Sequence, residues 1–294
     1  EAAAMNASKA GKKVGIISDK VNVGGNCTYL GTIPSKTIRH SVKQVVQFHA
    51  NPLLRNLGKL KKLTFQQALK QADRVIAEQG KSRHDAYERN YIPIFQGTAH
   101  FINGHQIQVE SGKSKTTLNA ENFILATGSR PYRPDDVDFS HPLVFDSDTI
   151  LELKDSPKKV TIFGAGVIGC EYASIFAGMK MKVELINPAE TLLSFLDTEI
   201  TDALSYHLQN VGVRCRHQEQ FSKLEYHDDH IVTYLESGKK IKSDILLWAN
   251  GRTGNTDKLN LEAIGLEADS RGTLKVDKRY QTAVHSVYAA GDVI

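Results

Sequence analysis

A glycine-rich turn between an apolar run and a predicted helix constrains the fold more than any other feature of the sequence. Val160-Thr-Ile-Phe is typical of a buried strand, and Gly164-Ala-Gly-Val-Ile-Gly169 follows it directly. The first glycine permits a tight turn, the second admits a pyrophosphate close to the backbone, and the third lets the helix pack on the strand. With a helix through Ala177 and a second strand over 183–186, the pattern indicates a β-α-β dinucleotide-binding unit rather than a loop that merely tolerates glycine. The candidate phosphate-binding residues are Gly164, Gly166, Val167, Ile168 and Gly169.

Asn187 stands at the end of that second strand, where such units carry the residue that selects between NAD and NADP. An acid at this place binds the ribose 2′-hydroxyl of NAD, and a nearby Arg binds the 2′-phosphate of NADP. Asn can hydrogen-bond a hydroxyl and does not repel a phosphate, so one interpretation is a site that accepts both dinucleotides. The alternative is that Asn187 only caps the strand and that selectivity is set elsewhere.

The order of predicted elements indicates an α/β fold with two units of this kind. A chain of 294 residues has the length of about two domains. Before the glycine-rich turn we expect a strand at 13–19, a helix entered at Pro34 and a helix entered at Thr64, which has a capping partner in Gln67. Asn103-Gly104 predicts a hairpin. Alternating strands and helices favour a parallel, doubly wound sheet, here twice over. Further buried strands are expected at 123–129, 241–249 and 287–290.

Composition excludes several classes of protein. Charged residues make up 24% and hydrophobic residues 40%, as in ordinary globular proteins, and the net charge is only +4. We therefore expect neither nucleic acid nor membrane as a partner, and the lysines at 59, 61 and 62 are interpreted as a solvated loop. Three cysteines are too few for a secreted disulfide framework, and no leader or membrane-spanning run is visible, which favours the cytoplasm. The histidines show no metal-ligand spacing, so no metal site is predicted.

A run of residues around Cys27 resembles the redox motif of the flavin disulfide reductases, the class I pyridine nucleotide-disulfide oxidoreductases. The run is Gly24-Gly-Asn-Cys27-Thr-Tyr-Leu-Gly-Thr32-Ile-Pro-Ser-Lys36. In that family a second cysteine follows the first after four intervening residues, and the two form a disulfide beside the flavin. Here the second position holds Thr32. Further matches follow in order along the chain: Ala126–Pro131, Gly164–Glu171, Ala249–Asn255 and Ala290–Asp292.

The resemblance implies cofactors and site residues. It implies FAD bound in one domain and NAD or NADP in a second, inserted domain, with Lys36 near the flavin and paired with Glu171 as the catalytic residues. Taken on position alone, Lys36 would be a solvated helix lysine and Glu171 a first-turn acid. Asp292 is expected at the ribityl or pyrophosphate end of FAD. Further candidate cofactor-binding residues are Ser18, Asp19, Val23, Gly24, Gly25, Asn26, Cys27, Thr28, Thr127, Gly128, Ser129, Gly251, Arg252 and Gly291.

The expected domains are 1–149 for FAD, 150–254 for NAD(P), and 255–294 as a return to the FAD domain, with the first boundary after the prolines at 131, 134 and 142. The chain begins within a predicted helix and ends just after a strand, so we expect an internal fragment of a longer protein. The first-domain strand and Gly-rich loop would precede it, and a C-terminal domain that forms a homo-oligomer would follow. The family carries Glu at the end of its second strand, whereas this chain has Ser18 and then Asp19; whether Asp19 takes that role is open.

The functional hypothesis follows from the absence of the second cysteine. A relay to a disulfide substrate needs two thiols, and Cys170 and Cys215 are interpreted as small buried residues. Electrons that reach the flavin would then leave by the same route, which predicts reversible hydride transfer between NADPH and NAD+ through FAD. The alternatives are an FAD-dependent NAD(P)H reductase of a quinone, a metal ion or a disulfide, like dihydrolipoamide dehydrogenase, and a catalytically inactive nucleotide-binding module.

Overall fold

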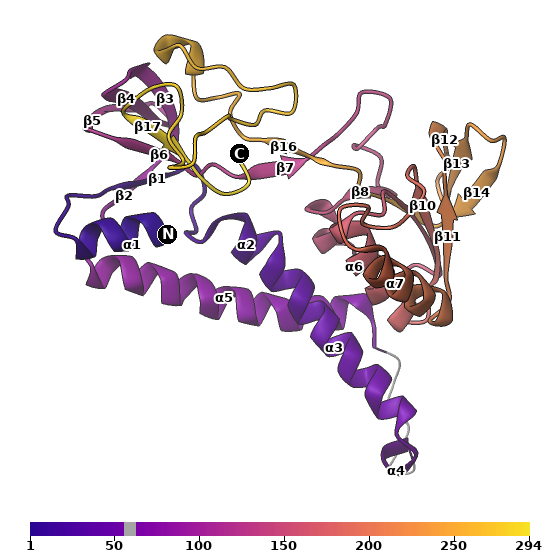
Figure 1. Cartoon of the computed structure of the whole chain (residues 1–294). Coiled ribbons are helices and arrows are strands. Elements are labelled where there is room, and N and C mark those ends of the chain that lie inside the picture. The colour runs from indigo at the N-terminus through magenta and orange to yellow at the C-terminus, as the bar shows by residue number, and fades with distance from the viewer. Residues whose placement is uncertain (56–62) are drawn as a thin grey trace. The chain divides into compact units, whose positions relative to one another are not determined.

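The computed structural model describes residues 1–55 and 63–294, so the predicted lysine loop at 59–62 lies outside the described residues. Contacts between α-carbons divide the chain into two compact units (Figure 1). Unit 1 comprises 1–29, 77–130 and 252–294, and unit 2 comprises 30–76 and 131–251. The boundary between the units that lies nearest the expected one at residue 150 falls earlier, between residues 130 and 131 in the proline-rich segment. Residues 30–76, which were expected in the FAD domain, belong to unit 2. The functional assignment of the domains stays a prediction.

A five-stranded parallel sheet forms the centre of unit 2, with the order β11-β10-β9-β15-β8. The central strands are buried on both faces, as expected of a parallel sheet covered on each side. This confirms the parallel sheet predicted around the glycine-rich turn. The strands are β8 (Val144–Asp146), β9 (Lys159–Phe163), β10 (Lys182–Asn187), β11 (Val213–His217) and β15 (Ile245–Trp248).

Helices of unit 2 pack against this sheet and against one another. Phe176 lies in the same buried cluster as Phe65, with ring centroids 5.5 Å apart. A Cβ on Gly178 would lie 2.6 Å from Val42, so the absence of a side chain there permits the close approach of α3 and α6. The helical elements are α3 (Thr32–Ala50), α4 (Pro52–Arg55), α6 (Val167–Gly178), α7 (Thr198–Asn210) and the 3-10 turn η1 (Thr149–Glu152).

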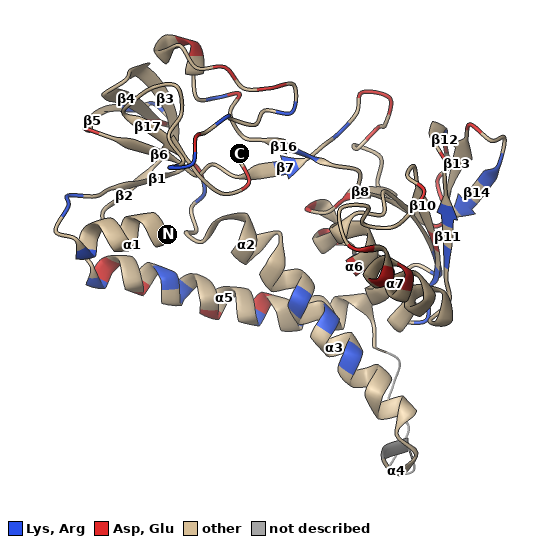
Figure 2. Ribbon diagram, in the orientation of Figure 1, with Lys and Arg blue, Asp and Glu red and all other residues tan. Residues whose placement is uncertain are grey.

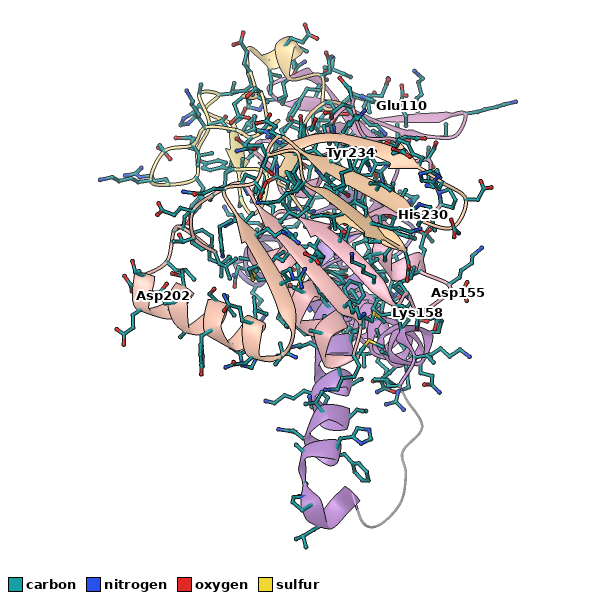
Figure 3. The ribbon with its side chains drawn as sticks, turned by 90° about the vertical axis from the view of Figure 1, so that its right-hand side faces the viewer. Glu110, Asp155, Lys158, Asp202, His230 and Tyr234 are labelled. Atoms are coloured by element: carbon teal, nitrogen blue, oxygen red, sulfur yellow. The ribbon has the colours of Figure 1, made fainter. Side chains whose placement is uncertain are left out.

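The single strand expected over 241–249 is wrong, because the structure divides it between two sheets. β14 (Lys240–Ser243) closes an antiparallel sheet with β12 (Phe221–Tyr226) and β13 (Ile231–Leu235), whereas β15 enters the parallel sheet. Asp244 lies between them, and its carboxylate accepts the backbone N–H groups of Lys158 and Lys159 at 2.6 and 3.0 Å. That anchoring redirects the chain at the polar residues 242–244, which interrupt the apolar pattern. In Figure 3 the labelled Tyr234 lies on β13 of the antiparallel sheet, and the labelled His230 directly precedes that strand.

Unit 1 contains short parallel pairs and one antiparallel sheet. β1 (Ile16–Ser18) pairs with β2 (Ile94–Gln96), and β6 (Phe123–Leu125) pairs with β17 (Val287–Ala289). Within the described residues these are separate two-stranded pairs, so the second doubly wound sheet is not seen as one continuous sheet. The other elements are α1 (Ala2–Lys9), α2 (Gly25–Tyr29), β3 (Thr98–Asn103), β4 (Gln106–Ser111), β5 (Ser114–Asn119), β7 (Ser129–Pro131), β16 (Arg252–Gly254) and the 3-10 turn η2 (Leu261–Ile264).

Two local predictions are confirmed at the expected residues. Asn103-Gly104 joins β3 to β4 as an antiparallel hairpin. The capping box opens α5 (Phe65–Arg89): the Thr64 N–H donates to the Gln67 side chain at 3.0 Å, and the Gln67 N–H donates to the Thr64 hydroxyl at 3.3 Å. Among the described residues, none of the helices combines the length and apolarity needed to cross a bilayer.

Candidate functional site

The glycine-rich turn of unit 2 has the geometry that each of its three glycines predicts. Gly164 adopts φ +104°, and a Cβ there would lie 2.6 Å from the carbonyl oxygen of Ala249. A Cβ on Gly169 would lie 1.9 Å from the carbonyl oxygen of Gly164, so only glycine permits this packing of helix on strand. A Cβ on Gly166 would meet nothing within 4 Å. The middle glycine therefore borders open space, as the approach of a pyrophosphate requires.

The N-terminus of α6 completes this cradle. The helix begins at Val167, and Gly166 caps it without any side-chain hydrogen bond. The first amides of a helix lack intrahelical partners and favour a negative charge. Val167 is 58% exposed, which keeps the first turn open. The residues Gly164 to Gly169 thus fit a dinucleotide pyrophosphate, while their contact with one stays a prediction.

Lys36 and Glu171 form the ion pair that the resemblance implied, but both residues lie in unit 2, whereas the pair was expected to join two different domains. The Lys36 ammonium on α3 donates to a carboxylate oxygen of Glu171 on α6 at 2.6 Å. The lysine side chain is 61% exposed and the glutamate 17%, so the charged end of Lys36 remains accessible. α3 carries Lys and Arg but no acid, as Figure 2 shows. Glu171 therefore supplies the carboxylate that holds this end of the lysine.

The Asn187 side chain is engaged in hydrogen bonds within the protein. The residue is 4% exposed; its amide NH2 donates to the Thr191 carbonyl at 2.9 Å and contacts His217 Nδ1 at 3.1 Å, and its oxygen accepts the Ala189 N–H at 3.2 Å. These contacts hold the turn after β10, in line with the capping alternative. His217 was missed by the sequence reasoning, because only the strand register places it beside Asn187.

In unit 1 the run before Cys27 forms the tight turn that leads into α2. Gly24 and Gly25 have φ +131° and +63°. Thr28 is fully buried, and its hydroxyl donates to the Gly24 carbonyl at 2.9 Å, which locks the turn. Val23 is also buried, whereas Cys27 is exposed. The structure thus presents Cys27 at the exposed surface of α2.

Ser129 links three other candidate residues that are distant from one another in the chain. The Asn26 amide donates to its carbonyl at 2.5 Å, and Arg252 donates to both its hydroxyl and its carbonyl at 2.7 Å. The Ser129 hydroxyl lies 3.4 Å from a carboxylate oxygen of Asp292. Asn255, which the site prediction omitted although its motif was matched, donates to the Thr127 carbonyl at 3.0 Å. These contacts bring together the parts of unit 1 to which flavin binding was assigned.

The remaining candidate residues lie at the end of β1 and in segments between elements. The Ser18 hydroxyl is engaged with the backbone of Lys20 at 3.2 Å, and Asp19 is exposed. Gly128, Gly251 and Gly291 all have positive φ, at +68°, +101° and +79°. No contact decides whether Ser18 or Asp19 binds a ribose, and this prediction stays open.

The three cysteines differ in their environments. Burial, with a smaller effect from Cys215, raises the pKa of the Cys170 thiol to about 12, and burial also raises the pKa of Cys215. All three thiols are free. Cys27 is thus the exposed thiol, and the interpretation of the other two as small packing residues agrees with the structure.

One group of metal-ligand type forms among the described residues, contrary to the expectation that no histidine has ligand spacing. His84, Asp85 and Glu88 on α5 have ligand atoms within 4.8 Å of one another. The group arises because residues four apart share a helix face. His84 and Glu88 are exposed, and none of the three residues belongs to the candidate sites above.

Comparison with known proteins identifies relatives over the whole chain. The sequence profile of the family described as "Pyridine nucleotide-disulphide oxidoreductase" matches residues 1–294. The chain is 56% identical over 295 aligned positions to the soluble pyridine nucleotide transhydrogenase of Azotobacter vinelandii (strain DJ / ATCC BAA-1303), and 54% identical to that of Pseudomonas aeruginosa (strain LESB58). Both alignments cover 100% of this chain and 64% of the relative. The chain thus spans less than two thirds of the length of these relatives.

Solved structures agree with this relationship. The HOCl-induced flavoprotein disulfide reductase RclA from Escherichia coli superposes with a TM-score of 0.85 at 28% identity, covering 99% of this chain and 62% of RclA. LpdA from Mycobacterium tuberculosis has a TM-score of 0.90 at 20% identity, covering 99% of this chain and 64% of LpdA, and supports the fold alone.

Proposed function

Because the chain belongs to the pyridine nucleotide-disulphide oxidoreductase family, we propose that it is the FAD- and NAD(P)-binding part of an NAD(P)+ transhydrogenase, which moves a hydride reversibly between NADPH and NAD+. The observation that carries the proposal is the lone exposed thiol. Thr32 stands where the resemblance implies the partner of Cys27, and burial raises the pKa of the other two cysteines, Cys170 and Cys215. A dithiol relay to a disulfide substrate needs two thiols, and the second thiol is missing here.

The proposed architecture has two Rossmann-like doubly wound domains, the NAD(P) domain being inserted in the FAD domain. The stretch 131–251 of unit 2 supports an insertion, because 77–130 and 252–294 on either side of it both belong to unit 1; the stretch 30–76 differs, since it belongs to unit 2 but falls within the proposed FAD domain. The proposed boundaries are 1–149, 150–254 and 255–294. The candidate flavin residues before position 130 and those at 291–292 belong to unit 1, whereas Gly164 to Gly169 and Asn187 belong to unit 2.

The residues of this chain would bind the two cofactors, orient them and shield them from solvent. The amides after Gly166 would hold the pyrophosphate of the nicotinamide dinucleotide. The run 24–28, Ser129 and Asp292 would hold FAD, which when bound accepts a hydride from one nicotinamide and donates it to another. Glu171 would fix the Lys36 ammonium, so that this cation contributes a constant positive charge to the site. A cytoplasmic location and a homo-oligomer complete the proposal; the three free cysteines support the location.

The test uses the full-length protein with NADPH and a reducible NAD analogue whose reduced form absorbs at its own wavelength, with no thiol or quinone added. We expect rapid reduction of the analogue. If NADPH reduces the flavin but the analogue stays oxidised, the electrons go to another acceptor, and the reductase alternative replaces this proposal. A flavin that NADPH does not reduce would favour the inactive module.

A further inference from the structure

Asn187 and His217 form a pair at the carboxyl edge of the unit 2 sheet. They are the last partners in the parallel register of β10 and β11. The glycine-rich turn reaches the same edge, because the Gly164 N–H donates to the Ile186 carbonyl at 2.9 Å. In open α/β sheets ligands bind outside the carboxyl ends of the strands. A dinucleotide held at the turn would therefore lie along the edge that carries this pair.

The hydrogen bonds of Asn187 determine how its amide is oriented. The Thr191 carbonyl can only accept, so it must face the amide NH2, and the Ala189 N–H can only donate, so it must face the amide oxygen. The second amide N–H therefore points to His217 Nδ1, at 3.1 Å. Because that atom receives a proton donor, it carries no proton itself. The imidazole is thus held as the neutral tautomer with its proton on Nε2.

Among the described residues, His217 Nε2–H has no hydrogen-bond acceptor, and the imidazole ring is half-buried. The turn after β10, residues 188–196, contains one ionisable side chain, the exposed carboxylate of Glu190. The nearest charged groups on the strands are already engaged: Arg216 pairs with Glu184 at 2.8 Å, and Glu219 with Lys239 and Ser237. Beside the exposed carboxylate of Glu190, this edge therefore offers a neutral donor at the position of His217, where an acid or an arginine would select one dinucleotide.

We propose that His217 Nε2–H binds the 2′ substituent of the adenosine ribose, with Asn187 as its positioning residue, so that NAD(H) and NADP(H) are accepted alike. The inference rests on the proposed function and assigns the selectivity of the same site. A neutral N–H can donate to a hydroxyl or to a phosphate oxygen. It does not repel the phosphate, as a carboxylate would, and it forms no ion pair with the phosphate, as a guanidinium would.

The test compares two probes that carry no nicotinamide, 5′-AMP and adenosine 2′,5′-bisphosphate, by calorimetry on the full-length protein. We expect the two affinities of the wild type to agree within about fivefold. His217→Arg should favour the bisphosphate by at least about tenfold, because a fixed cation replaces the neutral donor. Gln220→Arg is the matched control, since it adds the same charge at an exposed position three residues along the chain and should leave the ratio unchanged.

A second variant isolates the hydrogen bond. His217→Phe keeps a ring and removes both nitrogens, so both probes should bind about five- to tenfold more weakly. An unchanged ratio in His217→Arg, or equal shifts in His217→Arg and Gln220→Arg, would overturn the assignment of His217 while the proposed function stands. A wild type that binds neither probe would instead refute the dinucleotide site itself.

The tautomer can be measured without any variant. Nitrogen-15 NMR of the wild-type imidazole, assigned by comparison with His217→Phe, should show a protonated Nε2 and an unprotonated Nδ1 near neutral pH. A proton on Nδ1 would contradict the hydrogen-bond assignment and remove the basis of the proposal. The only tryptophan, Trp248, stacks on Phe163 with centroids 4.5 Å apart, so its near-UV circular dichroism reports whether each variant retains the fold of unit 2.

Discussion

The ammonium of Lys36 lies 2.6 Å from a carboxylate oxygen of Glu171, although 135 residues separate them in the chain. α3 and α6 bring them together, and these two helices approach closely where Gly178 faces Val42. The ion pair is thus a product of helix packing inside unit 2. Because the glutamate is only 17% exposed while the lysine is 61% exposed, Glu171 is held by the fold and Lys36 is held by Glu171.

Replacing Lys36 by Met should slow flavin reduction by NADPH by about tenfold or more while FAD stays bound, because a fixed positive charge is lost from the site. Stopped-flow absorbance of the flavin in the full-length protein measures the rate. Lys43→Met, at an exposed position on the same helix, is the control and should behave as wild type. Unchanged kinetics in Lys36→Met would remove this residue from the site.

The glycines of the turn allow stability and binding to be separated. Gly169→Ala should cost at least about 2 kcal/mol in the free energy of unfolding, because its Cβ would lie 1.9 Å from the Gly164 carbonyl oxygen. Gly166→Ala should change that free energy by less than about 0.5 kcal/mol, because its Cβ meets open space. The same alanine should weaken NADH binding at least about tenfold, since it occupies the approach of the pyrophosphate.

Denaturant unfolding and calorimetric titration of both variants check this pair of predictions. The two alanines serve as controls for each other, because they add the same methyl group three residues apart. Tight NADH binding by Gly166→Ala would show that the pyrophosphate does not approach that glycine.

Asn187→Asp should depress the use of NADPH far more than that of NADH. A carboxylate at this buried position would place a negative charge beside His217, which contacts the 2′ substituent in the proposed site, and it could no longer donate to Thr191 or to His217. We expect the ratio of kcat/KM for NADH over NADPH to rise by at least about tenfold. Steady-state kinetics with each dinucleotide measures the ratio. Equal losses for the two dinucleotides would contradict a site that serves both.

Cys27→Ser in the full-length protein should retain more than about half of the hydride-transfer rate, because transhydrogenation needs no thiol relay. The same variant should lose the fast phase of thiol titration, since Cys27 is exposed while burial holds the pKa of Cys170 at about 12. A fall of the rate to background would show that the thiol takes part in the reaction.

Glu219 should make stability depend on pH below neutrality. Hydrogen bonds from Lys239 and Ser237 hold the pKa of its carboxyl below the ordinary value of 4.5. A lowered folded-state pKa contributes stability that is fully present above the unfolded value and is lost as pH falls from there through the folded value. Glu219→Gln should therefore flatten the loss of stability below about pH 5. Glu236→Gln, at an exposed position, is the control and should follow wild type in unfolding titrations across this range.

The sequence by itself determined the features that depend on a few neighbouring residues. The turn at Gly164–Gly169, the capping box of Thr64 with Gln67 and the Asn103-Gly104 hairpin all formed where they were expected. In each case backbone sterics or local hydrogen bonds decide the conformation, so the types of the neighbouring residues are enough to predict it. The pairing of Lys36 with Glu171 was predicted from the resemblance to a family and not from the spacing of the residues.

Other features depend on which segments of the chain pack together, and only the tertiary structure decided them. The stretch 241–249 was expected as one strand, and the anchoring of Asp244 to the backbone of residues 158–159 divides it between two sheets. His217 carries no signal of its own, and the parallel register of β10 with β11 places it beside Asn187. Such contacts join residues far apart in the chain, and their partners are selected by the burial of whole helices and strands, which no local pattern encodes.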